Sequence, residues 1–418
     1  MNLKLQKSTV NRKSKIKITG SKSESNRLLL LQALFPEIKI ENLSNSDDSK
    51  LMQKALQSSQ NIIDIHHAGT AMRFLTAFFA TQADRKIVLT GSTRMQERPI
   101  QILVEALQQL GADINYEKKE GFPPLKIKGK KLTKNKVTLK ANVSSQYISA
   151  LLLVAPKLKN GLELTLEGEI TSVPYIKMTL SLLNQIRVET RFENNCITVK
   201  PQTSNLKPQT SNLKPQTLTV ESDWSSASYF YSIVALSPID TQIELSYYKN
   251  NSLQGDSVLS EIYKEFGVQT TFLNNYIIIK KASIVNRQSS IKLNLSNAPD
   301  IAQTIAVTCL GLRVECFLTG LHTLKIKETD RLLALKTEIE KLGGTIKITE
   351  DSLKLLASDI IKDNIEIETY NDHRMAMAFA PLALKTPIAI KDADVVSKSF
   401  PDFWNDLKNI GFHLSENK

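Results

Sequence analysis

The chain has 418 residues, 41% of them hydrophobic, and its 54 Lys and Arg exceed its 42 Asp and Glu to give a formal net charge of +12. This length exceeds one ordinary core and the apolar fraction can fill two, so a disordered chain is excluded and two globular domains are expected. The positive charge suits an anionic partner. Because only 6% of the residues are aromatic and no dense basic run occurs, small anions are favoured over nucleic acid.

The spacing of the cysteines and the length of the apolar runs restrict the class of protein further. The three cysteines, Cys196, Cys309 and Cys316, show neither a C-x-x-C spacing nor an even count, so neither a disulfide framework nor a zinc site is expected. The N-terminal segment lacks the continuous apolar region of a signal peptide, and runs such as 28–31 and 151–155 are too short to cross a bilayer. These features predict a soluble cytoplasmic protein with no metal and no membrane partner.

The first class of predicted element is an amphipathic helix, often ending at Leu-Gly or Phe-Gly, with alternating strand-like residues behind it. Six such segments follow one another along the chain, beginning at Leu51, Gln101, Met178, Ser257, Ala334 and Phe403. Gly at a helix end suits a left-handed cap, and the polar pair in segments such as FLNNYIII suits a hairpin turn. Each copy therefore predicts a helix followed by a β-hairpin, with three copies in each half.

A second class of helix lies between these copies and is more apolar. Its six members read SESNRLLLLQAL, TAMRFLTAFFA, SSQYISALLLVA, SSASYFYSIVAL, PDIAQTIAVTCL and DHRMAMAFAPLAL. A helix that is apolar on every side is buried, so these segments are expected to form the domain cores. Several open with Ser, Asp or Pro, which are N-terminal signals, so their free N–H groups are predicted to face a ligand.

Residues 201–217 form a tandem repeat of low complexity, PQTSNLKPQTSNLKPQT. The repeat has neither a helical period of 3.6 nor a strand period of 2, so it is predicted to be a surface insertion or a flexible linker. It lies close to the midpoint, and the chain is expected to change domain just after it, before Asp223.

Cations recur in short motifs rich in Ser, Gly, Asp and Glu. These motifs are GSKSESNR (20–27), HAGTAMR (67–73), GSTRMQERP (91–99), SSQ (144–146), KETDR (327–331), NDHRM (371–375) and SKSFPD (397–402). In most of them a cation stands beside hydroxyls, glycines or a carboxylate near the expected start of an apolar helix. Sites for phosphate or carboxylate are built in this way.

In this order, the motifs closely resemble those of the EPSP synthase family, the 3-phosphoshikimate 1-carboxyvinyltransferases of the shikimate pathway. GSKSESNR, AGTAMR, KETDRL and NDHRMAMA are specific in combination, and the resemblance covers nearly the whole chain. It implies an α/β (α+β) fold of two similar domains, each made of three βαβαββ units in an inverse α/β barrel-like arrangement, with the active site in the interdomain cleft. The expected domains are 1–19 with 220–418, and an inserted domain 20–219 that includes the repeat.

The resemblance implies transfer of the enolpyruvyl group of phosphoenolpyruvate to the 5-hydroxyl of shikimate 3-phosphate. The products would be 5-enolpyruvylshikimate 3-phosphate and phosphate, formed through a tetrahedral intermediate on the route to chorismate and the aromatic amino acids. Neither a metal nor an organic cofactor is implied. A monomer that acts on these two small molecules, without nucleic acid, is expected, and glyphosate is expected to compete with phosphoenolpyruvate.

The resemblance also assigns residues to the two ligands. Phosphoenolpyruvate would be bound by Lys22, Gly69, Arg94, Gln146, Arg331, Arg374 and Lys398. Shikimate 3-phosphate would be bound by Lys22, Ser23, Arg27, Ser144, Ser145, Gln146, Ser172, Tyr175, Asp300 and Lys327. Arginine forks suit the carboxylate and phosphate of the first ligand, and the hydroxyl cluster suits the phosphate of the second.

Three residues are implied in catalysis. Asp300 is the candidate base for the 5-hydroxyl, while Lys22 and Glu328 are alternative candidates for protonating the methylene carbon of phosphoenolpyruvate. Read without the resemblance, Glu328 and Arg331 fit an ordinary surface pair three residues apart, and Asp300 fits a helix cap as well as it fits a functional role. The adjacent pair Asp47-Asp48 is likewise interpreted as a capping element.

The chain departs from the common family pattern at His67, Phe74 and Thr323, where Asn, Pro and Asn are frequent. These departures concern the details of ligand contact and glyphosate affinity. The nearest alternative is the related transferase that acts on UDP-N-acetylglucosamine, but its reactive cysteine is missing from the loop 91–99. A non-enzymatic binder of anions or nucleic acid is favoured by net charge alone.

Overall fold

The computed structural model describes residues 1–140, 144–168, 170, 172–202, 216–283 and 289–416. The chain divides into two compact units, a discontinuous unit made of Met1–Gly20 and Glu221–Lys418 and an inserted unit, Ser21–Val220. The domain boundaries expected from the sequence differ from these by one residue at each junction. Most of the predicted repeat, residues 203–215, lies outside the described residues.

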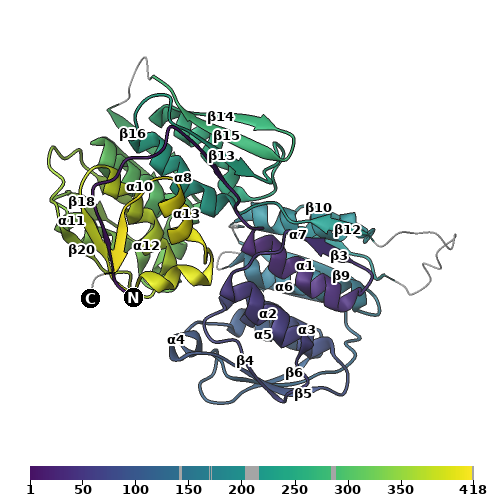
Figure 1. Ribbon diagram of the computed structural model, residues 1–418. Helices are drawn as coiled ribbons and strands as arrows, with labels where there is room; N and C mark the ends of the chain where they lie inside the picture. Colours follow the sequence, from purple (N-terminus) through teal and green to yellow (C-terminus); the bar gives the residue numbers. More distant parts are fainter. Residues whose placement is uncertain (141–143, 169, 171, 203–215, 284–288, 417–418) are drawn as a thin grey trace. The chain divides into compact units, whose positions relative to one another are not determined.

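The discontinuous unit contains three four-stranded sheets among its described residues (Figure 1). In spatial order they are β14 (Val268–Leu273), β15 (Tyr276–Lys281), β13 (Gln242–Ser246) and β2 (Lys13–Ile16); β16 (Ser290–Asn294), β17 (Glu315–Thr319), β19 (Leu353–Leu355) and β18 (Ile346–Ile348); and β20 (Ile365–Ile367), β21 (Ile388–Ile390), β1 (Leu3–Leu5) and β22 (Leu414–Glu416). Each sheet joins one parallel pair of strands to antiparallel neighbours, as in β16 and β17 beside β19 and β18. Parallel pairs need a crossover helix, so the order along the chain is strand, helix, strand, helix and then the remaining strands.

Three buried helices form the core of this unit. They are α8 (Trp224–Leu236), α10 (Ala302–Leu312) and α12 (His373–Phe379), and α10 packs against the other two. Every residue of α8 and of α12 is buried. The remaining α-helices, α9 (Leu259–Ile262), α11 (Arg331–Lys341) and α13 (Phe403–Asn409), are short or amphipathic and cover the sheets.

The inserted unit is built in the same way, with two four-stranded sheets and one two-stranded sheet among its described residues. The sheets are β10 (Thr190–Glu193), β11 (Cys196–Val199), β9 (Leu162–Glu167) and β8 (Lys136–Lys140); β4 (Ile62–Asp64), β5 (Lys86–Thr90), β7 (Leu125–Lys128) and β6 (Asp113–Tyr116); and β12 (Thr217–Thr219) with β3 (Lys39–Glu41). Its core helices are α1 (Lys22–Leu34), α3 (Gly69–Thr81) and α6 (Ser145–Val154). Its other helices are α2 (Asp47–Gln57), α4 (Thr93–Gln96), α5 (Gln101–Gln109) and α7 (Val173–Gln185).

The predicted burial of the six apolar helices is confirmed. Leu28, Leu29, Leu30 and Leu31 occupy consecutive positions of α1, so they point in all directions around the helix, and all four are buried. Each such side chain contributes roughly 1.5–3 kcal/mol when fully removed from water. A helix with this composition is stable only when other elements surround it. The first turn of α1 is therefore attached to a rigid core rather than to a mobile loop.

The prediction of a hairpin after every amphipathic helix is wrong for two of the six copies. A single strand, β4, follows α2, and it pairs in parallel with β5, the next strand along the chain. A single strand, β22, also follows α13, and its antiparallel partner is β1 from the start of the chain. Neither segment has a polar pair followed by a second apolar run, which is the pattern that closes the hairpin of β14 and β15.

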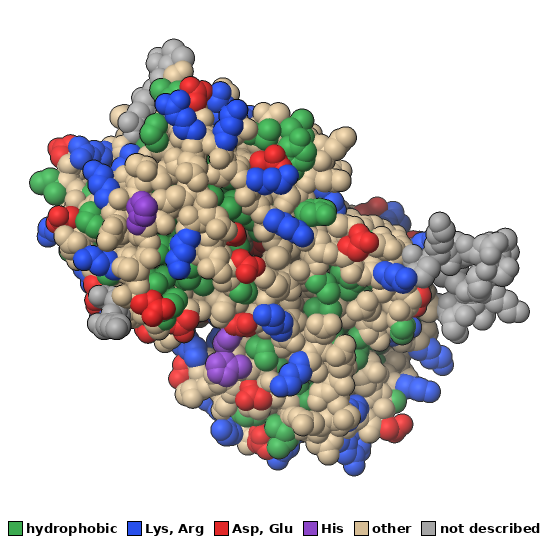
Figure 2. Space-filling model, viewed as in Figure 1, with side chains coloured by type: hydrophobic (Ala, Val, Ile, Leu, Met, Phe, Trp, Pro, Cys, Tyr) green, Lys and Arg blue, Asp and Glu red, His purple; other side chains and the backbone are tan. Residues whose placement is uncertain are grey.

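Within the described ranges, no helix combines the length and the apolar character that crossing a membrane requires. On the face drawn in Figure 2, Lys and Arg side chains of the described residues are interspersed with acidic and uncharged ones and form no continuous basic surface. The net charge of the chain is therefore not gathered on this face into the kind of stripe that typically binds nucleic acid.

Candidate functional site

Charged side chains gather around Asp300 in the discontinuous unit. Asp300 lies in the 3₁₀ turn η4 (Pro299–Ile301), directly before α10, and its side chain is 20% exposed. Its Oδ1 accepts a hydrogen bond from Arg331 Nη1 at 2.9 Å and lies 3.5 Å from Lys327 Nζ. Its Oδ2 accepts from Arg374 Nη2 at 3.2 Å. Three cations from two separate motifs of the chain therefore converge on one carboxylate.

Arg331 connects this carboxylate to two others. Its Nη2 donates to Glu328 Oε2 at 2.7 Å, and its Nε donates to Asp372 Oδ2 at 2.6 Å. The guanidinium is only 2% exposed. The interpretation of Glu328 and Arg331 as an ordinary surface pair is thus wrong, because the pair is buried in a network in which each partner has further ionic contacts.

The remaining cations of the cluster are also paired. Arg374 lies in the first turn of α12, where Asp372 caps the helix by accepting from the Arg374 backbone N–H at 2.9 Å. Lys398 Nζ lies 2.9 Å from Glu328 Oε1. Lys327, Arg331, Arg374 and Lys398 thus each have a carboxylate partner. The structure brings together all six residues that the sequence predicted in this unit: Asp300, Lys327, Glu328, Arg331, Arg374 and Lys398.

These charges set the protonation of Asp300. Burial alone raises the pKa of its carboxyl, but the nearby Arg374, Lys327 and Arg331 outweigh burial and hold that pKa well below its usual range. Asp300 is therefore ionised at neutral pH, and it is a weak base as long as the three cations face it. An anion that draws the arginines away from Asp300 would raise its pKa and make it a stronger base.

Lys22 has an acidic partner in the inserted unit. It is the first residue of α1, and its Nζ lies 3.4 Å from Asp48 Oδ2. Ser46 caps α2, whereas Asp48 is 3% exposed and faces Lys22. The interpretation of Asp47-Asp48 as a capping element is therefore corrected for Asp48, which lies beside a predicted catalytic residue.

His67, one of the departures from the family pattern, lies near the same carboxylate. Its Nε2 is 3.8 Å from Asp48 Oδ1, and its Nδ1 is 2.7 Å from Nδ1 of His66. A hydrogen bond between two imidazole nitrogens requires that one ring donates a proton and the other accepts it. The His66–His67 pair therefore carries one proton between the two Nδ1 atoms and places an imidazole edge beside Asp48.

Arg27 is buried in the inserted unit and holds several of the predicted residues in position. Its guanidinium donates to the carbonyl oxygens of Ser23 at 2.8 Å and Tyr175 at 3.4 Å, and to the hydroxyls of Thr179 at 2.8 Å and Ser149 at 2.9 Å. Burial lowers its pKa to about 10, so it remains a cation at neutral pH. Thr179 and Ser149 were not predicted from the sequence.

The serines predicted beside Arg27 lie at the starts of two helices. Ser144 caps α6 by accepting from the backbone N–H of Gln146 at 3.3 Å, and Ser145 is the first residue of that helix. Ser172 precedes α7 with a φ of 54°, a left-handed conformation that non-glycine residues rarely adopt. Residues 141–143, 169 and 171 next to them lie outside the described residues.

Segment 91–99, which contains α4, carries two arginines, Arg94 and Arg98, and their surroundings differ. Arg94 is about half exposed and pairs with Glu97 at 3.0 Å. Arg98 instead lies against the backbone of Gly69, since a Cβ added to Gly69 would be 2.5 Å from Arg98 Nη1. Gln146, also predicted in this region, donates to Thr70 Oγ1 at 3.2 Å. Of the two arginines, Arg98 is the nearer to the predicted glycine.

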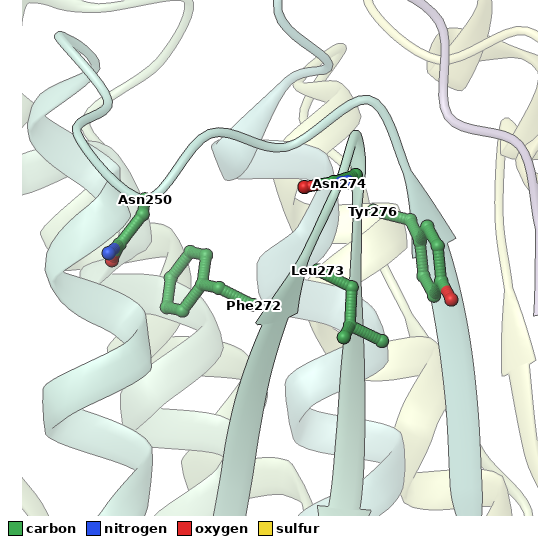
Figure 3. Close-up of a pocket in the computed structure, with 5 residues that line it drawn as sticks. All are labelled: Asn250, Phe272, Leu273, Asn274 and Tyr276. Carbon is green, nitrogen blue, oxygen red and sulfur yellow. The ribbon is translucent and has the colours of Figure 1, made fainter.

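A hollow of about 470 Å³ lies at the tip of the hairpin of β14 and β15. Figure 3 shows its lining residues, Phe272, Leu273, Asn274 and Tyr276 from the hairpin and Asn250 from a neighbouring loop. None of these residues belongs to the predicted site. The hollow is shallow and has no charged lining residue, so it does not suit a small anion.

Besides Thr179 and Ser149, three charged residues of the candidate site were missed from the sequence. They are Asp48, Arg98 and Asp372. A usable signal existed for Asp372, because it immediately precedes the apolar helix that carries Arg374 and so occupies a cap position. Arg98 stands four residues after Arg94 in one motif, and nothing in the local pattern distinguishes the two.

Comparison with known proteins gives a consistent result. The family model described as EPSP synthase (3-phosphoshikimate 1-carboxyvinyltransferase) matches residues 53–407. A Bacteroides fragilis (strain YCH46) protein named 3-phosphoshikimate 1-carboxyvinyltransferase is 47% identical over 408 residues, covering 96% of each chain. A Haemophilus influenzae (strain Rd) protein with the same name is 36% identical over 426 residues, covering 94% of this chain and 96% of the relative.

Solved structures share the fold. The EPSP synthase from Acinetobacter baumannii has a TM-score of 0.77 at 21% identity, with 99% of this chain and 100% of that one covered. The enolpyruvyl transferase NikO from Streptomyces tendae has a TM-score of 0.71 at 10% identity, with 100% of this chain and 98% of that one covered. At such low identity these likenesses concern the fold alone, and they confirm the predicted fold class.

Proposed function

This chain belongs to the EPSP synthase family, and from that premise we propose which of its residues carry the reaction of the family. The protein is an enzyme of the shikimate pathway that transfers the enolpyruvyl group of phosphoenolpyruvate to the 5-hydroxyl of shikimate 3-phosphate and releases phosphate. Two anionic ligands must be held despite their mutual repulsion, the hydroxyl must lose a proton, and the methylene carbon must gain one.

The observation that supports the residue assignment best is the convergence of Arg331, Arg374 and Lys327 on the carboxylate of Asp300. We assign phosphoenolpyruvate to Arg331, Arg374 and Lys398, whose charges match its phosphate and carboxylate. As the arginines turn toward this anion, their hydrogen bonds to Asp300 weaken and the pKa of Asp300 rises. Binding of phosphoenolpyruvate thereby makes Asp300 a stronger base toward the 5-hydroxyl of shikimate 3-phosphate.

Asp300 then accepts the proton of the 5-hydroxyl while the oxygen attacks the substituted carbon of phosphoenolpyruvate. The methylene carbon gains a proton and a tetrahedral intermediate forms. Phosphate then leaves from this intermediate while its new methyl group loses a proton, which restores the carbon–carbon double bond of the enolpyruvyl product. For the proton donor, Lys22 is favoured over Glu328. Both oxygens of Glu328 accept from cations, Arg331 at 2.7 Å and Lys398 at 2.9 Å, so a proton on either oxygen would replace an ion pair.

The residues proposed for shikimate 3-phosphate belong mainly to the inserted unit. They are Lys22, Ser23, Arg27, Ser144, Ser145, Gln146, Ser172 and Tyr175, together with Asp300 and Lys327. Arg27 binds the Ser23 and Tyr175 backbone and keeps a positive charge at neutral pH. We assign it the double role of orienting these residues and attracting the phosphate. Gly69 and Arg98 complete the phosphoenolpyruvate contacts, with Arg98 preferred over Arg94 because of its position against Gly69.

We further propose that the chain acts as a cytoplasmic monomer on these two metabolites rather than on nucleic acid. The mixed distribution of basic and acidic side chains in Figure 2 supports a preference for small anions.

The test of function is a coupled phosphate-release assay with purified protein and phosphoenolpyruvate. Rapid release is expected when shikimate 3-phosphate is added, and no release above background is expected with UDP-N-acetylglucosamine. Release with the nucleotide sugar alone would assign the chain to the alternative transferase. Release with neither acceptor, accompanied by salt-sensitive binding to DNA, would favour the non-enzymatic binder.

Gly69→Ala is expected to weaken both phosphoenolpyruvate and glyphosate, because the added methyl group would lie 2.5 Å from Arg98 Nη1 and displace the guanidinium. Loss of one hydrogen bond to a charged group predicts a KM for phosphoenolpyruvate raised about tenfold. Steady-state kinetics with and without glyphosate measure both effects.

Arg98→Ala should raise the KM for phosphoenolpyruvate more than Arg94→Ala does, and the reverse order would return the assignment to Arg94.

A further inference from the structure

Asp256 is a buried carboxyl group that the mechanism above does not use. It lies in the 3₁₀ turn η2 (Gly255–Val258) and is 3% exposed. It belongs to a segment remote in sequence from the ionic cluster. Neither the net charge of the chain nor the capping of a helix explains why this carboxyl is buried. Buried acidic groups without an ionic partner are rare, so its position calls for a physical reason.

A two-step hydrogen-bond path leads from Asp256 to the cluster. Ser225 Oγ donates its proton to Asp256 Oδ2, and the same Oγ accepts from Arg374 Nη2 at 3.3 Å. A serine hydroxyl has one proton and two lone pairs. With its proton directed at Asp256, the hydroxyl presents a lone pair to Arg374, whose Nη2 also donates to Asp300 Oδ2.

The surroundings of Asp256 show that its acceptor oxygen, rather than its charge, is the useful feature. Burial first, and the nearby Asp300 second, raise its pKa to about 7, while Arg374 and Ser225 act in the opposite direction. Its other oxygen, Oδ1, has no hydrogen-bond partner among the described residues. A charge is therefore costly at this position, whereas Oδ2 accepts from Ser225 whether or not a proton is bound at Oδ1.

We propose that Asp256 is a positioning residue for phosphoenolpyruvate: by orienting Ser225 Oγ, it fixes the guanidinium of Arg374 in the direction that the ligand requires. Nη2 of Arg374 donates both to Asp300, which is needed for catalysis, and to the neutral hydroxyl of Ser225. When Asp300 gives up its contact with Arg374, the hydrogen bond to Ser225 keeps Nη2 anchored while the guanidinium turns toward the ligand. This inference rests on the proposed role of Arg374 in binding phosphoenolpyruvate.

Asp256→Ala is expected to raise the KM for phosphoenolpyruvate about tenfold, the effect of one hydrogen bond to a charged group, with little change in kcat or in the KM for shikimate 3-phosphate. Asp256→Asn keeps an acceptor oxygen and should restore the KM to within about threefold of the wild-type value. Equal increases in the KM of both substrates would indicate general loosening and overturn the proposal, as would an Asn variant as impaired as the Ala variant.

Ser225→Ala tests the path itself and also serves if Asp256→Ala fails to fold. It should raise the same KM by a similar factor, and the double variant with Asp256→Ala should add nothing, because both changes break one path. Multiplying effects in the double variant, or an unchanged KM in Ser225→Ala, would contradict the proposal.

Asp406→Ala is the matched control. Asp406 lies in α13 of the same unit, burial also raises its pKa to about 7, and its Oδ2 has no hydrogen-bond partner among the described residues. Among the described residues no hydrogen bond or ion pair joins Asp406 to Ser225 or Arg374, so the KM values of the Asp406→Ala variant should equal those of the wild type. Arg374→Lys tests the premise separately: an unchanged KM for phosphoenolpyruvate in that variant would remove Arg374 from the site, whatever Asp256 does.

Discussion

Asp300→Asn is expected to bind both substrates and to release phosphate about 10² to 10⁴ times more slowly than the wild-type enzyme, the usual loss when a general base is removed. The amide keeps the shape of the carboxylate, and its single oxygen can accept from one of the two arginines that now donate to separate oxygens of Asp300, but it cannot take up the hydroxyl proton. The turnover number from the coupled assay measures the loss, and titration calorimetry with each substrate measures binding.

Asp330→Asn provides the control for this substitution. Asp330 caps α11 by accepting from the backbone N–H groups of Leu332 and Leu333, each at 3.1 Å, and asparagine caps helices equally well. The control should keep full activity. If Asp300→Asn changes kcat by less than about threefold, Asp300 is not the base.

Arg331→Leu is expected to cost about 3–5 kcal/mol of unfolding free energy and to abolish activity, because it leaves Asp300, Glu328 and Asp372 without the cation that joins them. Urea unfolding followed by circular dichroism measures the cost. The exposed Arg191, which pairs with Glu193 at 2.7 Å, is the matched control. Its replacement by leucine should leave the free energy of unfolding nearly unchanged, because solvent screens an exposed ion pair. Equal costs would show that the buried network does not stabilise the fold.

The difference between Arg331→Leu and the wild type should depend on pH. The cations of the cluster lower the pKa of Asp300 in the folded protein. The resulting stabilisation is present above the ordinary pKa of aspartate, about 3.9, and is lost as the pH falls through the folded value. Unfolding curves of the two proteins should therefore be furthest apart near neutral pH and converge below about pH 4.

The core helices were predictable because a helix that is buried on all sides has apolar residues on all of its faces. Leu28 to Leu31 in α1 have no polar face to present to water, so only an internal position suits them. The hairpins were predictable where a polar pair separates two apolar runs, as between β14 and β15. The pairing of β22 with β1 was not, because it joins the two ends of the chain and no local pattern reports it.

The site was predictable to the extent that single motifs carry it. Asp300, Arg331 and Arg374 each stand in a motif with its own helix start, and the structure brings their side chains within hydrogen-bond distance. The path from Asp256 through Ser225 to Arg374 depends instead on the packing of three distant segments. Periodicity and spacing are local properties, so they contain no information about such contacts.

A crystal structure with shikimate 3-phosphate and an unreactive phosphoenolpyruvate analogue tests the site assignment most directly. The analogue is expected to lie against Arg331, Arg374 and Lys398, and the phosphate of the other ligand beside Ser144, Ser145 and Arg27. A carboxylate oxygen of Asp300 is expected within hydrogen-bond distance of the 5-hydroxyl. An analogue bound away from these arginines, or a 5-hydroxyl that contacts no oxygen of Asp300, would contradict the site assignment.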